Sequence, residues 1–324
     1  MQVQVLSLSL AVTQSRSLQT GFSIGVCAAD RATNLATLVE LLESESYPSG
    51  LELRKIVIIA SGCEPTALAY AREVARRNDR LVLVEEPIRR GKSAAINQII
   101  DVFDGRFLVL VNSDALPERG AISKLLRIIA HDDGVGMVSA SPIVNGGAGI
   151  TGAVLQLMWG VHNECLFKLN DSDRNNHCCD ELIVVRSDAL LRKLPPGTVN
   201  DGAFLAGNAY QAGYSIRFCD EARVKIDVPR SFYDLMRQRR RIVYGHLQIW
   251  KSVGDSPRTL ESMLISNPLL SISILIKVLA TCPKLILALP VAAIGEVVSI
   301  ILAMHDHLIS SKRHVTWDRY GSRS

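Results

Sequence analysis

The stretch that decides the fold is Phe107-Leu-Val-Leu-Val-Asn-Ser-Asp114. An apolar run of this length that ends in small and polar residues is typical of a strand buried in a parallel sheet. It places a carboxylate, Asp114, at the carboxyl end of the strand. Open α/β sheets bind their ligands at that edge. Asp114 is therefore predicted to contact a metal ion or a substrate.

Two similar runs lie upstream, Lys55-Ile-Val-Ile-Ile-Ala-Ser-Gly62 and Arg80-Leu-Val-Leu-Val-Glu85. The first ends in small residues, which let a ligand approach the backbone closely. Helical patterns occupy the gaps between and after the runs, at residues 34–44, 66–77, 93–102 and 120–131. Strands and helices that alternate at this spacing favour βαβ units and a parallel sheet. The first half of the chain is therefore predicted to be a doubly wound α/β domain.

Composition favours one large domain. The 324 residues are 48% hydrophobic and 21% charged, which allows an ample core, and no Pro/Gly/Ser-rich linker divides them. A net charge of +4 is too small to indicate nucleic-acid binding. The seven cysteines include no CxxC pair, so we expect reduced thiols in a cytosolic compartment rather than a disulfide or zinc framework.

The two ends of the chain differ. Residues 1–20 lack the basic start of a signal peptide and are interpreted as a flexible extension. Residues 264–304 are almost continuously apolar. A membrane span needs about 20 apolar residues, so residues 285–304 are long enough for one span and residues 268–282 are marginal.

The apolar region has basic sequence on both sides, which indicates that both flanks face the cytoplasm. The basic residues are Arg237, Arg239, Arg240, Arg241 and Lys251 before it, and Lys312, Arg313, Arg319 and Arg323 after it. This favours a membrane-associated hairpin or re-entrant pair at residues 256–310, with its turn near residues 281–284, and a basic tail at 311–324. The alternative is a pair of core or oligomer-interface helices, because Glu296 and two prolines interrupt the region.

Two further segments carry candidate chemistry. Asn200-Asp201 precedes a helical pattern, so Asp201 is either a helix N-terminal residue or a carboxylate placed to act as a general base. The arginines after Gln238 form either a solvated face or a phosphate-binding group.

Residues 146–176 lie between these candidate sites. They are interpreted as an acceptor-binding or membrane-interface helix followed by a polar loop, with a core helix and surface loop as the alternative. His162 and His177 have no metal-ligand spacing.

Six segments in order resemble the family 2 glycosyltransferases, in particular the membrane-associated branch with hyaluronan synthase, cellulose synthase and ceramide glucosyltransferase. The resemblance covers about residues 20–250 and rests on Phe22-Ser-Ile-Gly-Val, Ile58-Ile-Ala-Ser-Gly-Cys63, Arg90-Gly-Lys-Ser-Ala-Ala-Ile-Asn97, Val111-Asn-Ser-Asp114, Asn200-Asp201 and Gln238-Arg-Arg-Arg241. It implies a GT-A fold at residues 21–255, with a mixed, mostly parallel sheet. It also implies inverting transfer of a sugar from a nucleotide diphosphate donor.

The resemblance also implies roles for individual residues. Asp114 matches the last Asp of the DxD motif, which binds Mn²⁺ or Mg²⁺ on the donor diphosphate. Asp201 matches the general base that deprotonates the acceptor hydroxyl. The implied donor-binding residues are Ser61, Lys92, Asn97, Asn112, Gln238, Arg239, Arg240 and Arg241.

The chain departs from the family pattern at four places. Asn112 replaces the first Asp of DxD, Asn200 an acidic residue before the base, and Ile242 the Trp of QxxRW. Ala60-Ser61 stand where many relatives have Asp-Asp, which puts uracil as the donor base in doubt. The retained Asp114, Asp201 and arginines favour an active enzyme. A lipid-linked or saccharide acceptor at a membrane fits the apolar C-terminal region, and the two alternatives are an inactive membrane scaffold and a sugar-nucleotide nucleotidylyltransferase.

Overall fold

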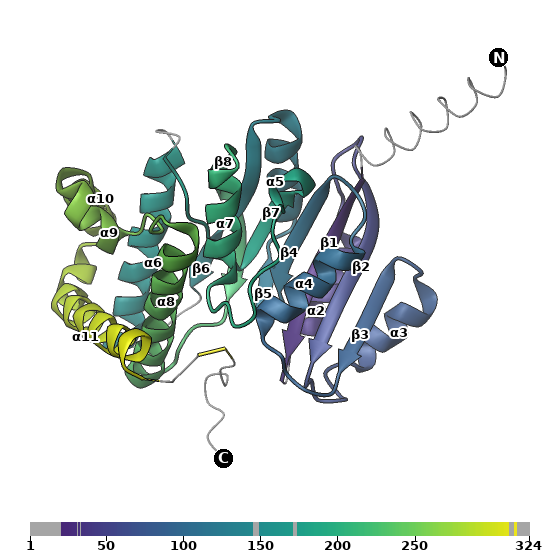
Figure 1. Ribbon diagram of the computed structural model, residues 1–324, viewed down its shortest axis with the longest axis horizontal. Coiled ribbons are helices and arrows are strands. Elements are labelled where there is room, and N and C mark those ends of the chain that lie inside the picture. Colours follow the sequence, from purple (N-terminus) through teal and green to yellow (C-terminus); the bar gives the residue numbers. More distant parts are fainter. Residues whose placement is uncertain are drawn as a thin grey trace.

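A computed structural model describes residues 21–30, 32, 34–144, 149–170, 174–310, 314 and 315. The predicted extension at residues 1–20 lies outside the described residues, as does most of the predicted basic tail. One eight-stranded sheet with helices on both faces forms the body of the protein, and a group of helices stands at one end of it (Figure 1).

The sheet has the strand order β3-β2-β1-β4-β7-β6-β8-β5. Four of the seven pairings are parallel, so the prediction of a mixed, mostly parallel sheet is confirmed. β7 is antiparallel to both of its neighbours, β4 and β6. The strands are β1 (Gly21–Ala29), β2 (Glu52–Ser61), β3 (Leu81–Glu86), β4 (Phe107–Asn112), β5 (Ala115–Pro117), β6 (Val135–Val144), β7 (Leu182–Arg186) and β8 (Ser215–Ile226).

Side chains alternate across the sheet and make one core on each face. One core packs α2 (Leu35–Ser44), α3 (Ala69–Arg77) and α5 (Ala121–His131) against the strands. The other packs α4 (Lys92–Val102) and α7 (Asp201–Gln211) against the opposite face. The four helices expected from the apolar patterns are all present, and their starts differ from the predicted ones by three residues or fewer.

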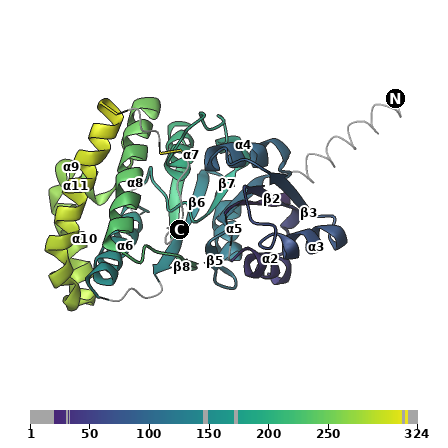
Figure 2. The same cartoon turned by 90° about the horizontal axis from the view of Figure 1, so that it is seen from below.

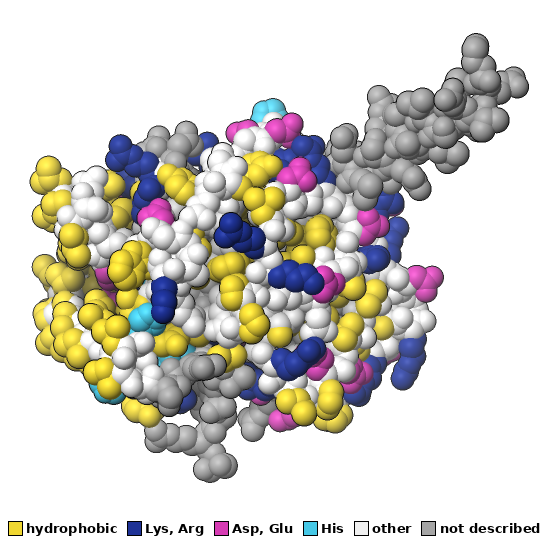
Figure 3. All heavy atoms as spheres, viewed as in Figure 1, with side chains coloured by type: hydrophobic (Ala, Val, Ile, Leu, Met, Phe, Trp, Pro, Cys, Tyr) yellow, Lys and Arg dark blue, Asp and Glu magenta, His cyan; other side chains and the backbone are white. Residues whose placement is uncertain are grey.

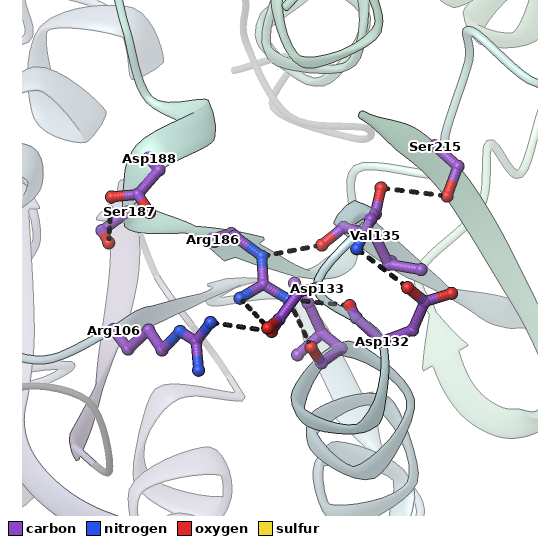
Figure 4. A network of polar contacts seen from close by, with 10 residues as sticks. Arg106, Asp132, Asp133, Val135, Arg186, Ser187, Asp188 and Ser215 are labelled. Atoms are coloured by element: carbon purple, nitrogen blue, oxygen red, sulfur yellow. Dashed lines mark hydrogen bonds and ion pairs between the residues drawn. The ribbon is translucent and has the colours of Figure 1, made fainter. Parts of the chain in front are cut away.

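A buried arginine fixes the middle of the sheet. Arg186, at the end of β7, is 1% exposed and donates from Nε to the Val135 carbonyl at 2.9 Å. Its Nη2 donates to the carbonyls of Ile129 and Asp132 at 2.6 and 2.8 Å (Figure 4). The guanidinium also lies 5.3 Å from the ring centre of Phe107. These contacts hold the turn after α5 against β4 and β7.

The C-terminal helices form a separate layer against two long helices, α6 (Gly149–Asn170) and α8 (Phe232–Val253). α9 (Leu260–Ser266) and α10 (Pro268–Thr281) pack with α6, whereas α11 (Leu289–Leu308) lies along α8 (Figure 2). Short 3₁₀ turns occupy Ser187–Ala189 and Pro283–Ala288. α10 ends at Thr281 and the second 3₁₀ turn begins at Pro283, so the helix is interrupted at Cys282, within the predicted turn region.

This layer exposes a large apolar surface, visible on the left of Figure 3. Pro283–Leu308 is long and apolar enough to cross a membrane, and 22% of its most apolar window is buried in the chain. Pro268–Thr281 is apolar but shorter. The low burial argues against a helix from the protein core. The packing of α11 along α8 and of α10 with α6 and α9 differs from a simple two-helix hairpin.

Candidate active site

One cavity of about 680 Å³ connects the sheet to the C-terminal helices. Its first part lies at the carboxyl ends of β1, β2 and β4, where Asp30, Ser61 and Asp114 form the wall. Its far part lies among α6 and α9–α11 and is lined by apolar side chains, among them Leu155, Leu264, Ile272, Leu275 and Leu289. The cavity therefore has a polar part at the sheet edge and an apolar part in the C-terminal layer.

The end of β4 brings acidic groups together. Asp114 follows the strand, and Asn112 closes it. The Asn112 amide Nδ2 donates to Glu181 Oε2 at 2.6 Å, and its backbone N donates to the Glu181 carbonyl at 3.1 Å. Glu181 directly precedes β7. Because β7 is antiparallel to β4, the start of β7 lies at the same edge of the sheet as the carboxyl end of β4, where ligands bind.

Lys92 lies at the centre of the polar part. It opens α4 after Gly91, whose φ of 92° is a conformation that favours glycine. Its Nζ is 2.7 Å from Asp201 Oδ2 and 2.9 Å from Asp180 Oδ2. One ammonium group thus joins the two carboxylates.

Local structure at the start of α7 fixes Asp201. Asn200 is the N-cap and accepts a hydrogen bond from the Ala203 backbone N, so the helix begins at Asp201, as predicted. Gly202 follows, and a Cβ on it would lie 2.3 Å from the Cβ of Asp180. The glycine therefore permits the close approach of α7 to Asp180.

The crowded carboxylates have shifted pKa values. Burial raises the pKa of Glu181 to about 8, and the negative charges of Asp180 and Asp114 add to this. Burial also raises the pKa of Asp201; Lys92 opposes this shift and Asp180 supports it. Burial acts in the same direction on Asp180, but Lys92, Arg241 and a backbone hydrogen bond together outweigh it and lower that pKa. A raised carboxyl pKa suits a group that accepts a proton near neutral pH.

The predicted arginine cluster is divided by the structure. Gln238, Arg239 and Arg241 lie on the cavity wall. Arg239 makes two hydrogen bonds to Glu296 at 2.8 and 2.9 Å and one to Glu261 at 3.1 Å. Arg241 donates to the Val199 carbonyl at 3.2 Å.

Two predicted donor-binding residues do not reach this cavity. Asn97 donates from Nδ2 to the Leu194 carbonyl and accepts from the Leu194 backbone N, both at 2.9 Å. Arg240 donates to Asp306 from both Nε and Nη2, on the side of α8 that faces α11. Both side chains are held by other parts of the fold, and their donor-binding roles stay predictions. Ser61 is on the wall and donates a hydrogen bond to Glu86.

Sequence reasoning missed Asp180 and Glu181. Two consecutive acidic residues directly before the apolar run Leu182-Ile-Val-Val185 were the available signal. It also left His162 and His177 as isolated histidines, whereas both line the cavity together with His246.

The donor set at the sheet edge fits a divalent cation. Among the described residues, no three His, Cys, Asp or Glu side chains are grouped so as to hold a metal ion by themselves. Mg²⁺ and related ions are commonly held by one or two carboxylates together with substrate phosphates. Glu181 lies beside this edge, and the charge of Asp114 adds to the effect of burial in raising its pKa. Asp114 therefore provides a suitable oxygen ligand for a cation that a diphosphate also binds.

The sequence comparison decides the family. Residues 20–245 match the model described as glycosyltransferase like family 2. The chain belongs to this glycosyltransferase family. No curated protein sequence matches the chain.

A solved structure confirms the fold of this glycosyltransferase. A mannosyltransferase from Pyrobaculum calidifontis, in complex with GDP-Man and Mn²⁺, is similar over 92% of this chain and 89% of its own, with a TM-score of 0.60 and 18% identity. The GT-A type of fold predicted from the resemblance is therefore shown. The GalNAc-T7 structure with UDP, GalNAc and Mn²⁺ has a TM-score of 0.48 and 14% identity over 64% of this chain and 44% of that chain.

Proposed function

We propose that the protein is an inverting glycosyltransferase that moves a sugar from a nucleotide diphosphate sugar to an acceptor at a membrane. The observation that carries this proposal is that one continuous cavity joins the polar and the apolar part of the site. It runs from Asp114 at the sheet edge, past Lys92 and Asp201, to the apolar helices α9–α11. A donor at the polar part and a lipid-linked acceptor from the apolar part would meet at Asp201.

The donor part is assigned from chemistry. A divalent cation, Mn²⁺ or Mg²⁺, would be held by Asp114 and would offset negative charge on the diphosphate. Ser61, Asn112 and Gln238 line the same wall and offer hydrogen bonds to the donor. Arg241 adds positive charge, which stabilises a departing diphosphate, whereas the charge of Arg239 is offset by Glu261 and Glu296.

Asp201 is the proposed general base. Its carboxyl has a raised pKa and takes the proton of the acceptor hydroxyl as that oxygen attacks the sugar. Lys92 holds the carboxylate through the 2.7 Å ion pair and so fixes its position. Attack on the side opposite to the diphosphate inverts the configuration at the sugar carbon.

Membrane association is proposed from the exposed apolar helices. Pro283–Leu308 could act as an anchor by its length and composition. The basic residues on both flanks favour a catalytic domain that faces the cytoplasm. We favour transfer of a single sugar over polymer export, since one or two spans are too few to build a wide channel.

The test is release of nucleotide diphosphate by the full chain in detergent. A panel of UDP-, GDP- and dTDP-sugars is offered with Mn²⁺ or Mg²⁺, and wild type is compared with Asp114→Ala. We expect metal-dependent release from one donor, lost in the variant. Absence of both release and donor binding would favour the inactive scaffold.

A further inference from the structure

Three histidines form a row on the wall of the cavity. His162 comes from α6, His177 from the segment before β7, and His246 from α8. The ring centres are 5.5 Å apart for each neighbouring pair, and the rings meet edge to face. Trp159 extends the row, with its ring 5.2 Å from that of His162. All four side chains line the same cavity as Asp201.

Two nitrogens of the row have no partner among the described residues. They are Nδ1 of His177 and Nε2 of His246, and both atoms are buried. His177 is only 6% exposed. Buried polar atoms in proteins are nearly always hydrogen-bonded, so a partner from within the cavity is expected.

Charged groups of the cavity act on the histidine row. The charges of Asp180, Arg239 and Glu261 influence the pKa values of both His162 and His246. Burial lowers the pKa of all three histidines, and Arg239 adds to this, which favours neutral rings at neutral pH. A neutral imidazole offers one donor and one acceptor, as a hydroxyl group does.

The charges around the row do not suit an anion. Arg239 is held by two carboxylates, Glu296 and Glu261, which leaves this group with a net negative charge. On the described wall of the whole cavity, acidic side chains outnumber basic ones by eight to five. A cation at Asp114 would reduce the excess of negative charge in the donor part of the cavity and not beside the histidines.

We propose that His162, His177 and His246 bind the polar head of the acceptor, and that this head is an uncharged, hydroxyl-bearing group on an apolar tail. The inference rests on the proposed function, which places the acceptor in this part of the cavity. It selects a neutral hydroxylated lipid over a lipid phosphate. The head would reach Asp201 while the tail extends between α9, α10 and α11.

Two probes with the same apolar tail test the inference, octyl β-glucoside and octyl phosphate. Each is titrated by calorimetry into the full chain in phosphatidylcholine nanodiscs, with empty nanodiscs as the blank. We expect wild type to bind the glucoside at least tenfold more tightly than the phosphate. His177→Leu and His246→Leu should each weaken glucoside binding at least fivefold. Glu261→Gln should tighten phosphate binding, because it removes one negative charge beside the row.

The controls separate recognition from folding. His246→Gln keeps a polar side chain and should retain glucoside binding within about threefold of wild type, since an amide also donates and accepts. His131→Leu, at an exposed histidine on α5, should bind the glucoside as wild type does. Equal or tighter binding of octyl phosphate to wild type, or undiminished glucoside binding by both leucine variants, would overturn the inference.

Binding of UDP and GDP with Mn²⁺ is measured on the same samples and reports on the proposed function separately. Nucleotide binding without a preference for the glucoside would refute the acceptor inference alone. A glucoside preference without binding of either nucleotide would support the neutral-head site and count against the proposed transferase.

Discussion

Gly202 sets the spacing of the two carboxylates that share Lys92. A methyl group at this position would lie 2.3 Å from Asp180 Cβ and 3.3 Å from its backbone Cα, so either α7 or the Asp180 segment must move. A displacement of about 1 Å can lower turnover about 100-fold. Gly202→Ala is therefore expected to reduce kcat/KM for sugar transfer by about that factor.

Gly207→Ala is the matched control on the same helix. The nearest atoms to a Cβ there belong to the Val253 side chain, at 3.1 Å, so a shift of a few tenths of an ångström relieves the contact, far less than at Gly202. We expect kcat/KM within about threefold of wild type. Equal losses in the two variants would show that the spacing at Asp180 is not what matters.

His246 makes the stability of the fold sensitive to acid. Its pKa is lowered to about 4 by burial, with Arg239 and His162 acting in the same direction and Glu261 and Asp180 opposing them. The ordinary pKa is about 6.5. As the pH falls from about 6.5 to about 4, the unfolded chain takes up a proton that the folded protein resists, so stability falls.

The measurement is thermal unfolding between pH 4 and 8 in wild type and His246→Gln. The variant lacks this titration and should lose less stability between pH 6.5 and 4 than wild type does. Parallel pH curves for the two proteins would contradict the assignment.

At the residue level, the sequence identified candidate site residues that directly follow a predicted strand or begin a predicted helix. Asp114 and Asp201 were predicted in this way, and both lie on the cavity wall. Asn97 and Arg240 were carried over from the resemblance, and the structure turns both toward other partners. The histidine row could not be foreseen, because its members come from three separate segments and meet only through the packing of α6 and α8.

At the scale of elements, Arg186 joins β7 to the turn after α5. Its removal leaves the carbonyls of Ile129, Asp132 and Val135 without their guanidinium donor. A buried group left without its partner typically costs about 1–3 kcal/mol. Arg186→Met is expected to lower the free energy of unfolding by about 3 kcal/mol, measured by urea denaturation.

Arg106→Met is the control for this element. Arg186 Nη1 also lies 3.4 Å from Asp133 Oδ1, and Arg106 pairs with the same carboxylate at 2.7 Å. Asp133 is 80% exposed, and surface pairs contribute at most about 1 kcal/mol. A loss as large as that of Arg186→Met would mean that the shared ion pair, and not the buried carbonyl contacts, stabilises the turn.

The order of strands and helices could not predict the direction of β7. Alternating strands and helices predicted the parallel strands β2, β3 and β4 and the helices between them, and these are confirmed, whereas β1 was not predicted from the pattern. Strand direction is not encoded in an apolar run, so the antiparallel placement of β7 was not foreseen. That placement is what brings Asp180 and Glu181 to the edge beside Asn112.

At the scale of the whole molecule, the exposed apolar face of α11 is expected to hold the protein at a membrane. Ile294 and Val298 are 66% and 42% exposed on this helix. A lysine at the centre of a span costs about 2.5–3.5 kcal/mol on insertion scales. The double variant Ile294→Lys, Val298→Lys should therefore shift from the floating to the soluble fraction in vesicle flotation.

Val102→Lys provides the comparison, since Val102 is 43% exposed at the end of α4, in the sheet domain. It should float with the vesicles as wild type does. Flotation of the double variant at the wild-type level would show that α11 does not anchor the protein.

The central claim is that Asp201 takes the acceptor proton at the meeting point of donor and acceptor. The most direct measurement is single-turnover transfer by Asp201→Asn, with donor binding measured in parallel and Asp227→Asn, an exposed carboxylate on the cavity wall, as the control. Loss of a general base typically costs about 10²–10⁴-fold in rate. We predict a loss of that size for Asp201→Asn, with donor binding retained and Asp227→Asn close to wild type. Transfer by Asp201→Asn at the rate of the control would contradict the account.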